Sequence, residues 1–187
     1  MQAPDGSIDG AAVSPGMEAK EVVHVRNQEA EASSRITVSR LIEHPEVLPI
    51  VVDWFLCEWP DWYGPGGPGD VGRDVHSYAN EGSLPVGVVA FFAGQPCGVA
   101  ALKVESIPSH THLAPWVAAG VVVPPLRGRG IGALLLAALE AEAQAFGYDR
   151  VYCGTATANS LLQRAAWRVI DTVQLHGKQV SIYAKEL

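Results

Sequence analysis

The feature that most constrains the fold is a strand, a glycine-rich turn and a helix that follow one another between Val121 and Ala143. The turn contains two arginines and three glycines: Arg127, Gly128, Arg129, Gly130 and Gly132. The first NH groups of a helix have no partner within the helix, and the peptide dipoles place partial positive charge there. Because glycines let a ligand approach the backbone closely, this turn predicts an anion-binding site.

A dinucleotide site is one alternative for the anion, since Gly128, Gly130 and Ala133 satisfy a GxGxxA pattern. However, Pro124 to Arg127 separate the strand from the glycines, whereas a dinucleotide site turns at once. The next strand is followed by no acidic residue for a ribose, and too little chain remains for a doubly wound sheet. A dinucleotide oxidoreductase is therefore the least favoured hypothesis for the function. A P-loop is excluded, because no Gly-Lys pair is followed by Ser or Thr.

Charge and cysteine content limit the partners and the compartment. The chain has 13 basic and 20 acidic residues, a net charge of −7, which argues against a broad nucleic-acid surface. Its cysteines, Cys57, Cys97 and Cys153, are odd in number and lack CxxC spacing, as expected for buried thiols in a reducing compartment such as the cytoplasm. Residues 1–20 resemble neither a signal peptide nor a membrane anchor, so a flexible tail before one domain at 21–187 is predicted.

The order of predicted elements indicates a mixed α/β sheet covered by helices. Strands are predicted at residues 35–41, 85–92, 97–105, 116–123, 151–153, 167–175 and 179–186. Helices are predicted from about residue 45 until Pro60 closes the first of them, and at 71–79, 131–146 and 159–165. The third helix is expected to present Leu134, Leu135 and Ala138 on one face. Gly120, isolated in an apolar strand, predicts a bulge or a close approach of another backbone.

This turn and the order of elements resemble the GCN5-related N-acetyltransferases. Arg127, Gly130 and Gly132 fill the fixed positions of the family's pattern, Gln/Arg-x-x-Gly-x-Gly/Ala. The resemblance implies a central, mostly antiparallel sheet flanked by helices, and acetyl-CoA as the cosubstrate with no metal. It implies that strand residues pair with the pantetheine arm and that turn NH groups hold the pyrophosphate. The implied cofactor-binding residues are Val121, Val122, Val123, Arg127, Gly128, Arg129, Gly130, Ile131, Gly132, Ala133 and Asn159.

The chain departs from the family in a later helix, where the family often has a tyrosine in LYxxxG followed by Phe or Trp. Here Leu162 stands in place of the tyrosine and Ala166 in place of the glycine. The family's usual acid for the leaving thiolate is therefore missing. A non-catalytic acyl-CoA-binding regulatory domain is the resulting alternative to an N-acetyltransferase.

The general base and acid are sought among four residues near the expected notch: Glu105, His110, His112 and Tyr152. Histidines titrate near neutral pH, and their HxH spacing has no third partner that would suggest a metal. Three residues of the segment EWPDWYG are candidates for the acceptor pocket: Glu58, Trp62 and Tyr63. The expected acceptor is a small-molecule amine or a protein amino group, with no nucleic acid or membrane as partner. The resemblance also makes a homodimer plausible.

Overall fold

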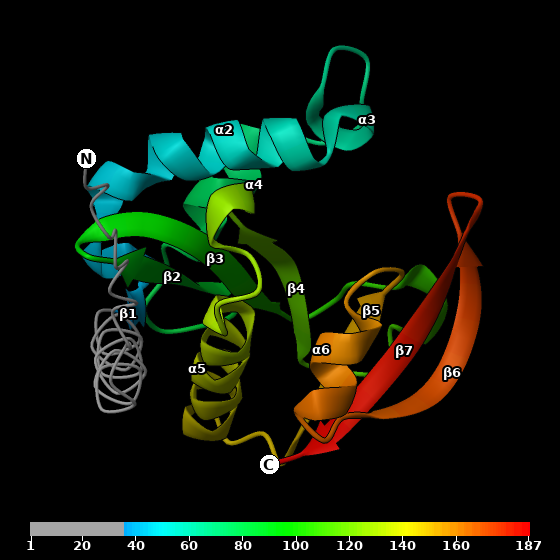
Figure 1. Cartoon of the computed structure of the whole chain (residues 1–187). Coiled ribbons are helices and arrows are strands. Elements are labelled where there is room, and N and C mark those ends of the chain that lie inside the picture. Colours follow the sequence, from blue (N-terminus) through cyan, green and yellow to red (C-terminus); the bar gives the residue numbers. More distant parts are fainter. Residues whose placement is uncertain (1–35) are drawn as a thin grey trace, which may run out of the picture. The chain divides into compact units, whose positions relative to one another are not determined.

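The computed structural model describes residues 36–187 (Figure 1). Its sheet has seven strands in the order β1-β2-β3-β4-β5-β7-β6. Neighbouring strands are antiparallel except β4 and β5, which are parallel. The strands are β1 (Ile36–Arg40), β2 (Val86–Phe92), β3 (Gln95–Lys103), β4 (Trp116–Val122), β5 (Arg150–Thr155), β6 (Arg168–Leu175) and β7 (Lys178–Glu186).

Five α-helices and four short 3-10 helices connect these strands within the described residues. The α-helices are α2 (Leu48–Glu58), α3 (Pro60–Tyr63), α4 (Val71–Tyr78), α5 (Ile131–Ala145) and α6 (Asn159–Arg164). The 3-10 helices are η1 (Leu41–Glu43), η2 (Pro45–Val47), η3 (Pro108–His110) and η4 (Pro124–Leu126). Proline stands in the first turn of several of them, where its missing NH costs nothing.

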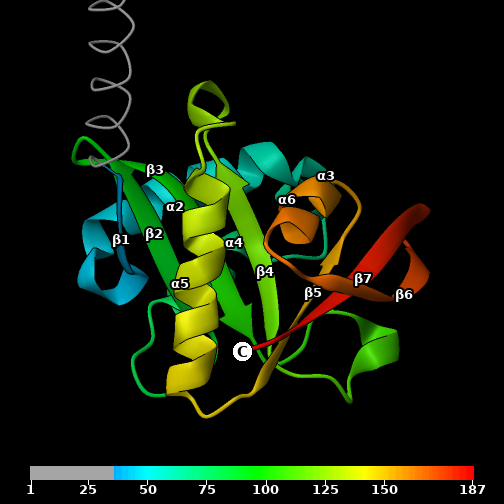
Figure 2. The ribbon, with the colours of Figure 1, turned by 60° about the horizontal axis from the view of Figure 1, so that its bottom comes forward.

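The helices cover both faces of the sheet, and each face has its own apolar core (Figure 2). Helices α2 and α4 pack against one face around Val51, Phe55 and Val89. Helices α5 and α6 lie on the opposite face, where Leu135 and Leu162 are buried. Together the layers confirm the predicted fold class.

Several predicted boundaries were wrong in ways that have physical causes. Pro60 does not close the first helix but begins α3, because α2 already ends at Glu58. Strand β3 ends at Lys103 rather than at Glu105. In α5, Leu139 and Ala143 are buried, whereas Leu134 is 42% exposed. Because three leucines follow one another here, the sequence does not decide which face of the helix is buried. In the structure the buried face is shifted by one residue from the predicted one, because the helix packs on β3.

The bulge predicted at Gly120 is confirmed. Ala118 pairs with Ala101 and Val121 pairs with Val99, so two residues of β4 stand opposite one residue of β3. Its first residue, Ala119, has a φ of 55°, in the left-handed region. The bulge bends β4 shortly before the glycine turn.

Strands β4 and β5 pair over only two positions before they diverge (Figure 2). The pairs are Trp116 with Tyr152 and Val117 with Cys153. Beyond them β4 continues beside β3 alone, and β5 continues beside β7. This divergence positions the candidate site.

The predicted tail at residues 1–20 lies outside the described part of the chain. None of the described helices is long and apolar enough to span a bilayer.

Candidate active site

The turn after β4 exposes a short stretch of unpaired backbone. Gly128 and Gly130 have φ values of 79° and 83°, and a Cβ atom at either position would meet nothing within 4 Å. Glycine is needed there for its left-handed conformation, and the space in front of the backbone is open. Gly130 is also the N-cap of α5, and no side chain caps this helix end.

The hydrogen bonds of the turn define which NH groups are free. The NH of Arg127 donates to the Pro124 carbonyl at 3.3 Å, and the NH of Ala133 donates to the Gly130 carbonyl at 3.0 Å. Within the described part of the chain, the NH groups of residues 128–132 have no acceptor. The NH groups from Arg127 to Ala133 were predicted to hold an anion, and only the five between these two residues are free to do so. They lie at the N-terminus of a 15-residue helix, which carries partial positive charge.

Four of these five residues, Gly128, Gly130, Ile131 and Gly132, line a cavity of about 550 Å³. One wall is the turn and the first residues of α5, and the other comes from α6. The residues of this wall are Leu161 and Arg164 on α6 and Ala165, which directly follows it. Sequence reasoning missed all three, although their spacing of three and four residues puts them on one helix face. Among residues 36–187, no carboxylate forms an ion pair with Arg164, which gives the cavity a free positive charge.

The two arginines of the turn have other partners. Arg127 donates through Nε to the Val122 carbonyl at 2.8 Å and pairs through Nη2 with Glu58 Oε2 at 3.0 Å. Its side chain thus ties the turn to the end of α2. The Arg129 guanidinium lies 5.9 Å from the centroid of the Phe92 ring. Glu58, predicted for the acceptor pocket, is therefore joined to the cofactor turn.

The other two predicted acceptor residues have different environments. Trp62 on α3 is 42% exposed, and its ring meets His176 of the β6–β7 turn edge-on at 5.9 Å. Tyr63 stacks on Phe55 and donates its hydroxyl to Asp74 at 2.7 Å. Burial, followed by this hydrogen bond, raises the pKa of Tyr63 well above its ordinary value. Tyr63 therefore joins α3 to α4, whereas Trp62 contacts the turn between β6 and β7.

The predicted catalytic residues gather near the beginning of β4, away from the turn. Glu105 and His112 are exposed in the loop before β4, and the rings of His112 and His110 stack at 5.7 Å. Tyr152 is buried on β5, beside Trp116 at 5.7 Å. The seven residues of β4 span about 20 Å from one end to the other. The structure therefore places these four residues toward the beginning of β4 and not at the glycine turn.

His110 has two defined partners. Its Nε2 lies 3.0 Å from Asp171 Oδ2, and its Nδ1 lies 2.9 Å from Ser109 Oγ. Because a carboxylate only accepts, a neutral His110 donates through Nε2 and accepts from Ser109 through Nδ1. The backbone NH of Thr172, and then His110, lower the pKa of Asp171. This contact ties the loop before β4 to β6.

Asn159 stands at the start of α6 and joins this helix to the sheet. Its Oδ1 accepts a hydrogen bond from the Tyr183 hydroxyl of β7 at 2.9 Å. Its Nδ2 is 3.4 Å from the Ala156 carbonyl. Leu162, at the family's tyrosine position, is 1% exposed and belongs to the core. Its side chain therefore packs and does not face the cavity.

The residues present fit a diphosphate-containing ligand such as coenzyme A. Within the described residues, five NH groups without an acceptor, an arginine without a carboxylate partner and open space over two glycines are what an anionic diphosphate requires. Among residues 36–187, no group of three or more His, Cys, Asp or Glu side chains could hold a metal ion.

Comparisons with solved structures give the same architecture. An aminoglycoside 6'-N-acetyltransferase complexed with coenzyme A superimposes with a TM-score of 0.65 at 16% identity, covering 80% of this chain and 96% of that one. YncA of Salmonella typhimurium, solved with its cofactor acetyl-CoA, gives 0.65 at 16% identity, with 81% and 94% covered. A GCN5-related N-acetyltransferase from Kribbella flavida gives 0.63 at 18% identity, with 82% and 99% covered.

No curated protein matches the chain in sequence. The model of the acetyltransferase (GNAT) family, however, matches residues 48–166, which include the bulged strand, the glycine turn, α5 and α6. This match covers more than half of the chain and includes both walls of the cavity. With the divergent strands and the unpaired helix N-terminus, it establishes that the chain belongs to the acetyltransferase (GNAT) family.

Proposed function

We propose that this protein is an acetyl-CoA-dependent N-acetyltransferase in which a primary amine attacks the acetyl carbonyl directly. The observation that carries the proposal is the row of five NH groups at residues 128–132 that have no acceptor within residues 36–187, four of them on residues that line a cavity of about 550 Å³. These donors supply a fixed, positively polarised cradle for the diphosphate of the cosubstrate. Arg164 adds an unpaired charge from the facing helix.

Direct attack is favoured over an acetylated cysteine because the nearby thiols are not activated. Cys153 is the last residue of β5 that pairs with β4, and burial raises its pKa to about 12. Burial also raises the pKa of Cys97, whose thiol donates to the Ala90 carbonyl. Since the thiolate is the nucleophile, neither cysteine suits a covalent intermediate at neutral pH.

Positioning can provide most of the rate enhancement despite Leu162. Holding two reactants in attack geometry contributes roughly 7–11 kcal/mol, whereas one general acid or base gives about 10²–10⁴ in rate. The divergence of β4 and β5 leaves backbone groups of both strands without partners across the gap. We propose that the pantetheine arm pairs with β4 there, at Val121 to Val123, and thereby orients the thioester. The acceptor is a small-molecule amine or a protein amino group, with Trp62 at its entrance.

The identity of the general base stays a prediction among Glu105, His110 and His112, with Tyr152 as the predicted acid. Single variants Glu105→Gln, His110→Asn, His112→Asn and Tyr152→Phe test these roles. A true general acid or base gives a kcat lower by about 10²–10⁴ at unchanged acetyl-CoA affinity. Variants of the residues without such a role change kcat little.

A second candidate function is a non-catalytic acyl-CoA sensor. It is favoured by Leu162, whose core position leaves no hydroxyl at the family's acid position. The sensor and the enzyme share the same cofactor cavity and differ only in turnover.

One experiment separates the two functions. Purified protein is titrated with acetyl-CoA in a calorimeter and then incubated with acetyl-CoA and a panel of amines while free thiol is measured. We expect saturable one-to-one binding and amine-dependent thiol release. Binding without release on any amine favours the sensor, and absence of binding contradicts both functions.

A further inference from the structure

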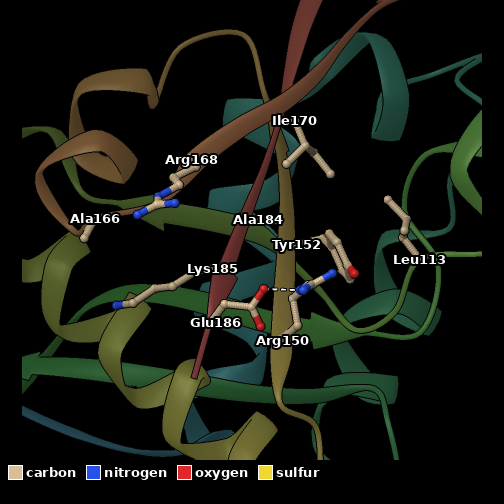
Figure 3. A pocket seen from close by; sticks show the side chains of 9 residues that line it. All are labelled: Leu113, Arg150, Tyr152, Ala166, Arg168, Ile170, Ala184, Lys185 and Glu186. Atoms are coloured by element: carbon tan, nitrogen blue, oxygen red, sulfur yellow. Dashed lines mark ion pairs between the residues drawn. The ribbon is translucent and has the colours of Figure 1, made fainter.

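The second cavity of the described structure lies on the face of β5, β7 and β6 that is opposite to α6 (Figure 3). Its volume is about 500 Å³, and it shares no lining residue with the cavity at the glycine turn. It lies beside Tyr152, which pairs with the first residue of β4, whereas the turn follows the last. The two cavities are therefore separate sites.

Strand register explains why the sheet is hollow here. Tyr152 on β5 and Arg168 on β6 are both cross-strand neighbours of Ala184 on the central strand β7. The short side chain of Ala184 therefore forms the floor of the cavity, with Tyr152 on one side of β7 and Arg168, whose guanidinium points toward Ala166, on the other (Figure 3). A bulge in β6 leaves Ile170 without a partner on β7, and this residue lines the cavity at 49% exposure.

The cavity has more positive than negative charge, although the whole chain carries −7. Arg150 forms an ion pair with Glu186 at one end of the cavity (Figure 3). The Lys185 side chain points away from Tyr152 and Leu113, and its ammonium pairs with Glu140 at 2.6 Å (Figure 3). No carboxylate among residues 36–187 pairs with Arg168. One guanidinium is therefore available to an anion.

The remaining walls are apolar. Leu113 from the loop before β4, Ile170 from β6 and the Tyr152 ring surround the Ala184 floor. A planar guanidinium matches a carboxylate through two parallel hydrogen bonds. A dianion such as phosphate is less suited, because only one guanidinium is free and the Glu186 carboxylate stands nearby. Apolar walls with a small number of polar groups are typical of small-molecule sites.

We infer that this cavity, here named the Arg168 site, binds a small monocarboxylic acid whose apolar body lies over Ala184 and whose carboxylate pairs with Arg168. The site is independent of the proposed acetyl transfer, because it uses neither the glycine turn nor α6. Its position beside Tyr152, which pairs with the first residue of β4, places a ligand at the base of the divergent strands.

The test uses benzoate as the probe and the full-length protein at low ionic strength. We expect saturable amide shifts in two-dimensional NMR spectra that centre on Tyr152, Arg168 and Ala184, with millimolar affinity. Arg168→Gln weakens binding at least about tenfold, whereas Arg73→Gln, an exposed arginine on α4, leaves it unchanged. Benzamide, the neutral analogue, binds at least about tenfold more weakly than benzoate.

A second variant tests the shape of the site without changing its charge. Ala184→Leu fills the floor and abolishes benzoate binding, and its thermal unfolding reports whether it has folded. Equal binding by the Arg168→Gln and Arg73→Gln variants would overturn the inference, as would equal affinity for benzamide or displacement by equimolar phosphate. Arg168→Gln decides alone if Ala184→Leu does not fold. Acetyl-CoA binding is expected to persist in Arg168→Gln, so this result is separable from the proposed function.

Discussion

The two ends of β4 differ in whether their backbone groups are paired and covered by side chains. At its beginning, Trp116 is buried, pairs with Lys103 on one side and Tyr152 on the other, and donates its indole NH to the Leu113 carbonyl. At its end, the strand has lost β5, passes through a bulge and enters a turn whose NH groups have no acceptor among the described residues. One end is closed by large side chains, and the other is left open by glycines.

This difference shows how one strand can fix the geometry of a site at one end and offer free hydrogen-bond donors at the other. The closed end gathers Ile107, Tyr152 and Ile182 into a small core that fixes where β5 leaves β4. At Gly154 a Cβ atom would come within 2.9 Å of Ile107, so the loop before β4 approaches β5 very closely. The open end can then keep unpaired donors, since its geometry is fixed by the helix and by the closed end.

The largest expected effect comes from filling the open end with charge. Gly130→Glu places a carboxylate where the diphosphate is proposed to bind, and we expect acetyl-CoA affinity to fall at least about 100-fold, or about 2.7 kcal/mol. Calorimetric titration measures the change.

Gly147→Glu is the matched control, because Gly147 ends the same helix with a φ of 85° and equally open space. Both variants bear similar backbone strain, but only Gly130 lies at the helix N-terminus. Equal affinities in the two variants would show that the turn does not hold the cosubstrate.

A smaller loss is expected when the charge facing the turn is removed. Arg164→Gln keeps the size of the side chain but removes the unpaired guanidinium of the cavity wall. We expect the Kd for acetyl-CoA to rise about tenfold at low salt, with a smaller difference at high salt because of screening. Arg73→Gln serves as the control, and a Kd that is the same in both variants would remove Arg164 from the site.

The open end could be predicted from sequence because its signals are local. Gly120 indicated the bulge, and the alternation of arginine and glycine before an apolar helix indicated the turn. The wall formed by Arg164 was missed, because only tertiary packing brings α6 to the turn. The contacts of Arg127 with Glu58 and of His110 with Asp171 span 69 and 61 residues, and no local pattern signals them. Helix α5 shows the same limit, since the apolar run around Leu134 suits two faces equally well.

The point where β4 and β5 diverge can be tested at Cys153, the last β5 residue that still pairs with β4, by asking whether its thiol takes part in the reaction. Cys153→Ala removes the thiol, and we expect kcat to stay within about threefold, because a thiol with a pKa of about 12 is protonated at neutral pH. Mass spectrometry of the wild-type protein after brief exposure to acetyl-CoA should show no acetylated Cys153. A large loss of kcat together with an acetylated cysteine would replace direct attack by a covalent route.

The smallest effect is expected at the closed end, where Asp171 accepts from the Thr172 backbone NH and from His110. These bonds lower the pKa of Asp171 in the folded state, so they stabilise the fold above the ordinary aspartate pKa of about 3.9. The contribution is lost as the pH falls through the lowered folded pKa, where the carboxylate becomes protonated in both states. Because Asp171 is exposed, Asp171→Asn should lower the Tm by only about 1–2 °C at pH 7. The difference from wild type should vanish at low pH, and a difference that persists unchanged there would mean that the Asp171 charge does not hold the loop to β6.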